Sequence, residues 1–257
     1  MTAAGEAAPD DGGSNEAGPF PAEIGALAAF IAGRPQDGRL TPPADPALAP
    51  GPPARLTRRA EMFGRADAAA GLTATKLMGE PVAPLGAAAG GFRLIRSLRD
   101  GYVGHVADPA GDLLGPLAPP AGAAWRRVAA GRARIHSAPD EKARVRPGAV
   151  FLEERVAAAA PARRERGFLQ LADGGWIAER ALAAETAAPR DWVAAAEGLI
   201  GAPYVWGGDT PEGLDCSGLV KLAMWAADRV CPRDSDMQAA FFARAVPDGA
   251  PLWRGDL

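Results

Sequence analysis

The sequence predicts an α+β fold in which a β-rich part precedes a helical part. Between about residues 57 and 182, short apolar runs are separated by glycines and charged residues, a pattern typical of small antiparallel β-domains. From "PRDWVAAAEGLIG" (189–201) onward, apolar residues recur at helical spacing. A chain of 257 residues is long enough for two or three such domains.

Residues 1–54 are expected to form a disordered and proline-rich N-terminal segment. The first 20 residues are small, polar and rich in Gly and Asp, so we expect them to be disordered. The stretch "PAEIGALAAFIAG" (21–33) predicts a short helix. The prolines of "RPQDGRLTPPADPALAPGPPARL" (34–56) exclude a long helix and indicate an extended segment that wraps or links.

Two β-rich stretches follow, at residues 55–118 and 119–188, and they share an order of features. In each, a Gly-Phe strand precedes a turn that combines Asp, Gly and an aromatic residue: "DGYVGHV" (100–106) and "DGGWIAERAL" (173–182). The period of about 70 residues is the size of a small barrel, which favours a duplicated unit. The alternative is two unrelated β-rich stretches.

Composition and charge exclude some classes of function. With 48% apolar and 23% charged residues, the composition is ordinary for a soluble globular protein. The net charge of −3 gives no basis for general nucleic-acid binding. No apolar run reaches the ~18–20 residues of a membrane span, and the N-terminus does not resemble a secretory signal. We therefore expect a cytoplasmic protein that does not associate with membranes.

The last segment, residues 189–257, is expected to be helical around a single cysteine. Residues 189–201 predict an amphipathic helix that ends at Gly201. The stretch "GLDCSGLVKLAMWAADRV" (213–230) predicts a second helix, buried on most of its surface, with Lys221 and Asp228 as its only polar stripe. A disulfide between Cys216 and Cys231 is not expected, because both lie on this helix and its exit.

Cys216 is the strongest candidate for chemistry. Asp215 is a good N-cap, so Cys216 would lie in the first helical turn, where unpaired N–H groups and the helix dipole lower a thiol pKa. The glycines of "WGGDTPEG" (206–213) would let backbone and substrate approach closely. The alternative is a small structural thiol among apolar neighbours. Because Cys216 instead stands between Asp215 and Ser217, the pattern favours a nucleophile.

The motif around Cys216 resembles that of a known family. "APYVWGGDTPEGLDCSGLV" (202–220) resembles the nucleophile motif of the NlpC-type cell-wall peptidases, which are papain-like cysteine peptidases, and "PRDSDMQ" (232–238) resembles the segment after their catalytic helix. The two β-rich stretches resemble the paired bacterial SH3-like domains of one subgroup. The resemblance covers about residues 55–257 and is strongest over 199–240. It implies two small SH3-like β-barrels followed by a partial papain-like α+β peptidase domain.

The resemblance also implies an activity. Members of that subgroup are γ-D-glutamyl-L-diamino acid endopeptidases, which cleave peptidoglycan stem peptides after an N-terminal L-alanine during cell-wall recycling. It implies that this chain binds peptidoglycan-derived peptides (muropeptides), and we expect a monomer without a cofactor or metal. The alternatives are a cell-wall peptide-binding module without catalysis, another papain-like acyltransferase or amidase, and a metal or redox site. Two cysteines without nearby histidines argue against the last of these.

Carried over position by position, the resemblance implies the roles of eight residues. Cys216 is the nucleophile that attacks the γ-glutamyl carbonyl, Tyr204 helps to hold the oxyanion, and Trp206 lines the pocket. Asp215 faces the free amine of L-alanine, Ser217 adds a hydrogen bond, Asp234 and Ser235 line the same pocket, and Tyr102 covers it from the first SH3-like domain. Glu61 is the nearest match to a glutamate that often joins this tyrosine, although its surroundings align poorly. From the residues alone, aromatic side chains such as Tyr102 and Trp206 are more often packing residues than binding residues, and Asp215 and Ser217 can be helix caps.

A cysteine peptidase needs a base, and the sequence does not offer an obvious one. The two histidines, His105 and His136, both precede Cys216, whereas the family's histidine follows the nucleophile on a β-strand. The stretch "PLWRGDL" (251–257) resembles the entry into the first strand of the family's catalytic sheet. We therefore expect the sequence to be truncated before its catalytic histidine and the chain as printed to be inactive.

Overall fold

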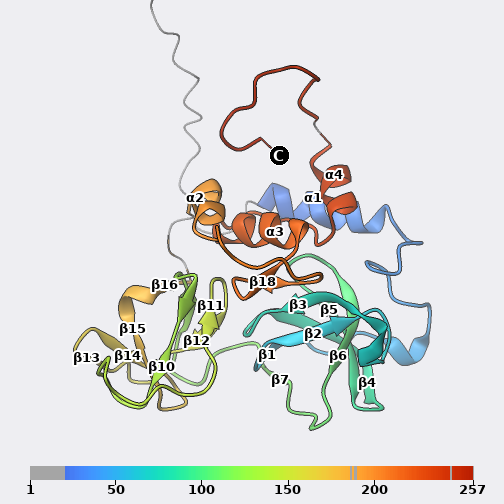
Figure 1. Cartoon of the computed structure of the whole chain (residues 1–257). Helices are drawn as coiled ribbons and strands as arrows, with labels where there is room; N and C mark the ends of the chain where they lie inside the picture. Colours follow the sequence, from blue (N-terminus) through green and yellow to red (C-terminus); the bar gives the residue numbers. More distant parts are fainter. Residues whose placement is uncertain (1–20, 186, 188–189, 244, 257) are drawn as a thin grey trace, which may run out of the picture.

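The computed structural model describes residues 21–185, 187, 190–243 and 245–256. The disorder expected for residues 1–20 lies outside the described residues. An N-terminal helix is followed by two β-units and then by three further α-helices, and the helices lie along one side of the β-units (Figure 1). The predicted α+β class, with β-sheet regions before a helical C-terminal part, is confirmed.

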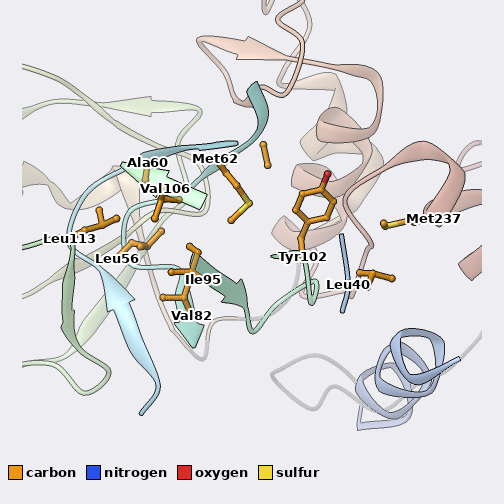
Figure 2. Packing of buried hydrophobic residues seen from close by; sticks show 11 residues of the cluster. Leu40, Leu56, Ala60, Met62, Val82, Ile95, Tyr102, Val106, Leu113 and Met237 are labelled. Atoms are coloured by element: carbon orange, nitrogen blue, oxygen red, sulfur yellow. The ribbon is translucent and has the colours of Figure 1, made fainter. Parts of the chain in front are cut away.

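The first β-unit is a seven-stranded antiparallel sheet in the order β3-β2-β6-β5-β4-β1-β7. Its strands are β1 (Ala54–Leu56), β2 (Ala60–Phe63), β3 (Leu72–Lys76), β4 (Pro81–Ala89), β5 (Phe92–Ser97), β6 (Val103–Ala107) and β7 (Leu114–Pro116). A short 3-10 helix, η2 (Ala68–Ala70), joins β2 to β3. Buried apolar residues at alternate positions of these strands form one core, which Figure 2 shows.

The second β-unit is divided among three small sheets, ordered β10-β15-β14-β13, β11-β9 and β12-β8-β16. Its strands are β8 (Trp125–Val128), β9 (Arg132–Ala133), β10 (Ile135–His136), β11 (Val150–Phe151), β12 (Arg155–Ala157), β13 (Arg164–Glu165), β14 (Phe168–Gln170), β15 (Trp176–Ala178) and β16 (Leu182–Ala184), with a 3-10 helix, η3 (Glu179–Ala181), before the last strand. These short strands enclose a second apolar core.

The two Asp-Gly turns singled out in the sequence form the same kind of hairpin in both units. Asp100 Oδ1 accepts a hydrogen bond from the backbone N–H of Tyr102 at 2.9 Å, between β5 and β6. Asp173 Oδ1 accepts one from Gly175 at 2.9 Å, between β14 and β15. An aspartate that bonds the backbone two residues later stabilises a tight turn, which explains the recurring residue type.

The N-terminal segment packs on the first β-unit and on the C-terminal helices. It begins with α1 (Pro21–Ala32), as predicted for residues 21–33, and continues through a short 3-10 helix, η1 (Pro46–Leu48), to β1. The Arg39 carbonyl accepts a hydrogen bond from Val103 at 2.7 Å, and Leu40 enters the core beside Tyr102 and Met237 (Figure 2). The predicted wrapping segment therefore contributes to the core of the first β-unit.

The C-terminal part contains α2 (Trp192–Glu197), a hairpin of β17 (Asp209–Thr210) and β18 (Gly213–Leu214), α3 (Cys216–Ala226) and α4 (Ser235–Phe242). The prediction that the helix after residue 189 ends at Gly201 was wrong. Its C-cap is Gly198, and Ile200 is 84% exposed. The glycine three residues earlier ends the helix, because glycine is a poor helix former and a favourable end.

The prediction that Lys221 belongs to a polar stripe of α3 was also wrong. The helix is buried on most of its surface, as expected, but Lys221 is itself fully buried, and α3 ends before Asp228. Helical spacing identifies a charged position on a helix, but it does not show that carboxylates from other elements surround that position. Lys221 is therefore held by buried ion pairs, and water does not solvate it.

The two β-units contact each other and both contact α3. Arg59 Nε of the first unit lies 2.8 Å from Glu154 Oε1 of the second, and the Arg155 N–H donates to the Met78 carbonyl at 2.9 Å. Leu77 and Leu152, one from each unit, pack into the apolar cluster of α3. The catalytic candidate therefore begins a helix that rests on both units. Among the described residues, none of the helices is long and apolar enough to cross a membrane.

Gly101 offers a test of how α1 is held on the first β-unit. Its φ is +74°, and a Cβ at this position would overlap the side chain of Ile31 in α1. We expect Gly101→Ala to lower the free energy of unfolding by about 1–3 kcal/mol more than Gly111→Ala, measured by urea unfolding. Gly111 is the matched control because its φ is +68° and its surroundings are open. Equal losses in the two variants would show that α1 does not depend on this contact.

Candidate active site

Cys216 is the first residue of α3, as the sequence predicts. Asp215 is the N-cap, with extended backbone angles, and its Oδ1 accepts a hydrogen bond from the Gly218 N–H at 2.7 Å. The Cys216 side chain is a free thiol and is exposed, whereas Cys231 is a free thiol in the interior. The alternative of Cys216 as a structural thiol is not supported, because it does not contribute to an apolar core.

The glycine-rich loop before Cys216 is built by close backbone approach. A Cβ at Gly208 would overlap the Gly213 carbonyl, and a Cβ at Gly218 would overlap the Gly208 carbonyl. Gly207 has a φ of +73° and lies against Leu72 of β3. These glycines allow the β17–β18 hairpin to fold onto the first turn of α3 and against the first β-unit.

Two aromatic side chains are exposed on the segment that leads into this hairpin. Tyr204 is 65% exposed and Trp206 is 72% exposed. The Tyr204 backbone forms a bridge with Leu214, next to the cap of α3. Large apolar side chains that project into solvent beside an exposed thiol are available to contact a ligand. Trp206 is therefore not a packing residue of the described chain, and the ligand-binding roles of both aromatics stay predictions.

The carboxylate of Asp215 is engaged by five donors. Besides Gly218, it accepts from the Gly207 N–H at 2.9 Å, from Ser217 Oγ at 3.2 Å, and from two nitrogens of Arg233 at 2.8 and 3.1 Å. Arg233 also donates to Ser217 Oγ at 2.9 Å. This bidentate pair fixes the residues on both sides of Cys216, so its backbone orientation is set by a buried arginine.

The pKa of Asp215 follows from these contacts. Burial alone would raise it, but the guanidinium of Arg233 and the N–H groups of Gly218 and Gly207 outweigh that effect and hold the pKa below its ordinary value. Arg233 is 1% exposed, and its own pKa is raised because Asp209 and Asp215 favour its charged form more than burial opposes it. The pair is ionised across the neutral pH range.

A row of buried charges continues from Arg233 into the first β-unit. Arg233 Nε lies 3.1 Å from Asp209 Oδ2, and Lys221 Nζ lies 2.9 Å from the same oxygen. Lys221 is 3.8 Å from Asp100, and Asp100 is 3.1 Å from Lys76. All of these side chains are buried, so the Asp-Gly turn between β5 and β6 is connected by charge to the cap of α3.

The charge states along this row are set by burial and by neighbours. Burial opposes ionisation of Asp100, but Lys76 and Lys221 outweigh it and lower the Asp100 pKa. Burial likewise opposes the charge of Lys76, but Asp100 and Glu80 raise its pKa. For Lys221, burial dominates over Asp209 and lowers its pKa. Opposite charges at distances of 2.9–3.8 Å offset part of the cost of burying this row.

Tyr102 reaches the same region from the first β-unit. Its ring belongs to the apolar core, and its hydroxyl donates to Asp234 Oδ2 at 3.0 Å. Burial and the Asp234 carboxylate raise the Tyr102 pKa, so the hydroxyl remains protonated. Arg39 of the N-terminal segment donates to the same Asp234 oxygen at 2.8 Å and to Asp236 at 2.8 Å. Tyr102 is thus a core residue whose hydroxyl contacts Asp234, and its role in covering the pocket stays a prediction.

Ser235 and Glu61 also lie near this region. Ser235 is the first residue of α4 and is exposed beside Asp234, the N-cap of α4. Glu61 is exposed on β2 directly opposite Thr75 of β3, whose hydroxyl donates to the Gly207 carbonyl at 3.3 Å. Opposed side chains share one face of a sheet, so Glu61 lies on the face that meets the glycine-rich loop.

The two histidines are part of the β-units. His105 lies on β6 and His136 on β10, and burial lowers the His105 pKa. Among the hydrogen bonds of the described residues, none joins Cys216 to either histidine. The described part of the chain also holds no group of three or more His, Cys, Asp or Glu side chains placed to bind a metal ion. Both positions are compatible with the expectation that neither histidine is the catalytic base.

Sequence reasoning missed four charged residues that organise the site: Arg39, Asp209, Lys221 and Arg233. Arg233 stands inside the recognised stretch "PRDSDMQ", so the signal was present, but its function as the partner of Asp215 requires the fold. Arg39 lies 195 residues from Asp234 in the sequence, in a proline-rich stretch without a motif. Neither spacing nor composition connects residues so far apart.

Arg233 should be needed for stability. Its replacement by Met leaves the buried carboxylate of Asp215 without a cation, so we expect Arg233→Met to lower the free energy of unfolding by about 3–5 kcal/mol. Urea unfolding followed by circular dichroism measures the loss. The control is Arg254→Met, which removes an exposed pair with Asp191 and should cost about 0–1 kcal/mol. Losses within about 1 kcal/mol of each other would show that the Arg233 pair is not a structural requirement.

Asp215 should make stability depend on pH in the acid range. Because its pKa is lower in the folded than in the unfolded chain, Asp215 stabilises the fold fully above the unfolded pKa of about 4, and this stabilisation is lost as pH falls toward the folded pKa. Asp215→Asn should therefore be less stable than the unaltered chain at pH 7, with a gap that narrows between about pH 5 and pH 3 in urea unfolding. Asp112→Asn, at an exposed aspartate paired with Arg58, is the matched control and should cost about 0–1 kcal/mol at pH 7. A gap that stays constant with pH would contradict this assignment.

Comparison with known proteins shows that the segment around Cys216 is similar to a described family. Residues 201–257 match the NlpC/P60 family. Over 77 residues the chain is 43% identical to a gamma-DL-glutamyl hydrolase of Bacillus subtilis (strain 168), covering 29% of this chain and 19% of that protein. Over 47 residues it is 49% identical to probable endopeptidases of Mycobacterium bovis and Mycobacterium tuberculosis, covering 18% of this chain and 12% of each relative. The chain thus spans only a minor part of the length of these relatives.

The likeness to a solved structure extends further along the chain. The crystal structure of an NlpC/P60 family protein from Bacillus cereus matches with a TM-score of 0.61 and 17% identity, and the match covers 79% of this chain and 81% of that one. At this identity the likeness concerns the fold. The C-terminal part of the chain, with Cys216 at the start of α3, therefore matches the NlpC/P60 family, and most of the chain has the fold of an NlpC/P60 family protein.

Proposed function

We propose that this chain belongs to a cysteine peptidase that hydrolyses the γ-D-glutamyl–diamino acid bond of peptidoglycan stem peptides with a free N-terminal L-alanine. The observation that carries the proposal is the exposed Cys216 thiol at the N-terminus of α3, within the residues that match the NlpC/P60 family. The similarity to a gamma-DL-glutamyl hydrolase supports a γ-glutamyl bond as the target. The muropeptides released during cell-wall recycling are the proposed substrates.

The chemistry at Cys216 is nucleophilic acyl transfer. The Sγ thiolate attacks the γ-glutamyl carbonyl, and the carbonyl oxygen becomes an oxyanion that unpaired N–H groups in the first turn of α3 can stabilise. Tyr204, exposed two residues before Trp206, is the proposed second donor to this oxyanion. The tetrahedral intermediate then collapses: the C–N bond to the diamino acid breaks, the amine leaves after gaining a proton, and a thioester with Cys216 remains. Water attacks this thioester, the γ-glutamyl carboxylate is released, and the thiol is regenerated. Both halves need a proton carrier beside the sulfur.

The first β-unit is proposed to recognise the substrate's free amine. The Tyr102 hydroxyl donates a hydrogen bond to Asp234 and keeps its proton. The lone pairs of its oxygen can therefore accept a hydrogen bond from an ammonium group. The carboxylate of Asp234 adds negative charge on the same side, and Glu61 lies on the sheet face that meets the loop. We propose that Asp215 and Ser217 contact the substrate next to Cys216. Arg233 fixes the positions of both through hydrogen bonds. Ser235, exposed at the start of α4, is proposed to border the same pocket.

The two β-units are proposed to be SH3-like domains, and the matching fold of the Bacillus cereus protein supports their placement before the helical part. In this arrangement the first unit closes one end of the cleft with Tyr102. A closed end selects short peptides that begin with a free amine and disfavours longer chains, because extension would meet the tyrosine and lose the ammonium contact.

A second candidate function is peptide binding without hydrolysis. The observation that favours it is the position of both histidines on strands of the β-units, β6 and β10, ahead of Cys216 in the chain. Among the described residues no hydrogen bond joins an imidazole to the thiol, so these residues supply recognition groups but no paired base. We therefore propose that the 257-residue chain, tested alone, binds the stem peptide as a monomer and turns it over very slowly.

Binding and cleavage of one peptide test both functions together. We expect L-alanyl-γ-D-glutamyl-diaminopimelate to bind the chain in isothermal titration, and the N-acetylated peptide to bind about tenfold more weakly or less, because acetylation removes the ammonium charge. Tyr102→Phe should reduce this preference. Chromatography of the same mixtures should show no release of diaminopimelate.

Three outcomes would contradict these expectations in different ways. Equal binding of the free and acetylated peptides would refute amine recognition. No binding of either peptide would remove the support for stem peptides as the ligand. Release of diaminopimelate at a rate that is lost in Cys216→Ala would show that the chain contains its own base, and the non-catalytic alternative would then be wrong.

A further inference from the structure

Arg39 lies beside the proposed amine site although it belongs to the N-terminal segment. Its backbone N–H donates to Asp37 Oδ1 at 3.0 Å, and its carbonyl accepts from the N–H of Val103, the residue after Tyr102, at 2.7 Å. The next residue, Leu40, is buried beside Tyr102 in the core of the first β-unit (Figure 2). The backbone of Arg39 is therefore fixed against the strand that follows Tyr102.

All five N–H groups of the Arg39 guanidinium have acceptors. Nε and Nη2 donate to the two oxygens of Asp37 at 3.0 and 2.9 Å. Nη1 and Nη2 donate to the two oxygens of Asp236 at 3.0 and 2.8 Å, and Nη1 also donates to Asp234 Oδ2 at 2.8 Å. A guanidinium has five N–H donors in a rigid fork, so these hydrogen bonds use its full capacity. Arg39 therefore orients carboxylates and does not itself reach for a ligand.

The carboxylates around Arg39 outnumber it. Hydrogen bonds from Arg39 hold the pKa of Asp37 and that of Asp236 below their ordinary values, and the same bonds raise the pKa of Arg39. With Asp234, three carboxylates contact one guanidinium, so the group has a net negative formal charge. Arg233 Nη1 lies 3.9 Å from Asp234, but two buried aspartates already engage this arginine. Counting all of them together does not remove the negative excess, which favours a cationic ligand group.

Asp234 is the N-cap residue of α4, but its carboxylate does not cap the helix. Its side chain makes no hydrogen bond to the N–H groups of the first turn, although an aspartate at this position ordinarily does. Instead, Oδ2 accepts from both Arg39 and the Tyr102 hydroxyl, at 2.8 and 3.0 Å. Within the described part of the chain, no group donates a hydrogen bond to Oδ1, and the Asp234 side chain is 23% exposed. Arg39 and Tyr102 thus hold the carboxylate away from α4 and leave Oδ1 open.

We propose that Arg39 is a positioning residue for recognition of the substrate's ammonium group, an inference that rests on the proposed function. Its guanidinium holds Asp234 so that Oδ2 accepts the hydrogen bond of Tyr102 and Oδ1 can accept one from the ammonium group. The Tyr102 oxygen offers its lone pairs to the same group. Arg39 does not touch the ligand and acts through Asp234 and Tyr102. The N-terminal segment therefore takes part in substrate selection.

Two substitutions of Arg39 separate its geometry from its charge. Arg39→Met removes both, whereas Arg39→Lys keeps the charge and loses the five-donor fork. In isothermal titration, the unaltered chain should prefer L-alanyl-γ-D-glutamyl-diaminopimelate over its N-acetylated form about tenfold. We expect this preference to fall to about twofold or less in Arg39→Met and to an intermediate value in Arg39→Lys, because Asp234 can then rotate toward the first turn of α4.

Arg34→Met is the matched control for both substitutions. Arg34 belongs to the same N-terminal segment, and its guanidinium donates to the Phe30 carbonyl at 3.3 Å and lies 3.6 Å from the centre of the Phe30 ring. Its replacement removes one positive charge from the segment without touching Asp234. Arg34→Met should therefore keep the preference of the unaltered chain for the free amine.

A measurement without ligand tests the position of Asp234 directly. The chain has two tyrosines, Tyr102 and Tyr204, so labelling tyrosine with ¹³C at Cζ gives two NMR signals, which Tyr204→Phe assigns. The hydrogen bond to Asp234 should separate the Tyr102 signal from that of the exposed Tyr204. We expect Arg39→Met to move the Tyr102 signal toward the Tyr204 signal and Arg34→Met to leave it in place.

The outcomes distinguish this inference from the proposed function. If the unaltered chain binds both peptides equally, amine recognition is wrong and the role of Arg39 in it fails as well. If the unaltered chain prefers the free amine but Arg39→Met keeps that preference, or if the Tyr102 signal does not move, only the role of Arg39 is wrong. A stronger preference in Arg39→Met would show that Arg39 competes with the ammonium group for Asp234, which also overturns the proposal. If Arg39→Met does not fold, Arg39→Lys decides, because an unchanged preference there contradicts a role for the fork.

Discussion

A row of buried charges connects the first β-unit to the residue that precedes Cys216, and the rest of the structure depends on it. The row runs from Lys76 through Asp100 to Lys221 and Asp209, and Arg233 continues it to the cap of α3. In a dry interior, each charge is tolerated only because its neighbours have the opposite sign. The row therefore fixes the distance and orientation between the β-unit and the helix more strictly than apolar packing, which is not directional.

The proposed substrate end of the site is assembled from three distant parts of the chain. Tyr102 comes from the first β-unit, Asp234 from the start of α4, and Arg39 from the N-terminal segment. The proline-rich segment is thus more than a linker, because it supplies a side chain and a core residue, Leu40, to the same region. Its prolines exclude a long helix, so it follows the surface of the β-unit through turns and the short helix η1.

Local signals in the sequence predicted the local part of this structure. The Asp215 cap, the position of Cys216 in the first turn and the α+β order all follow from residues close together in the chain. The position of Lys221 was misjudged because its partner Asp100 lies 121 residues earlier, and helical periodicity describes only which positions share a face. The early end of the helix at Gly198 shows the weakness of boundary predictions when two glycines stand near each other. The hydrogen bond between Tyr102 and Asp234 joins residues 132 positions apart, which no local pattern could predict.

The buried charges also determine which parts of the chain could be exchanged independently by recombination during evolution. Lys76 and Asp100 belong to one unit and Lys221 to another, so a recombination event that joined the Cys216 helix to a different domain would leave an ammonium group and a carboxylate stranded in the interior. Such a chimaera would fold poorly unless the new domain brought matching charges at the same places. We therefore expect the first β-unit and α3 to be inherited together, although they are separate structural elements.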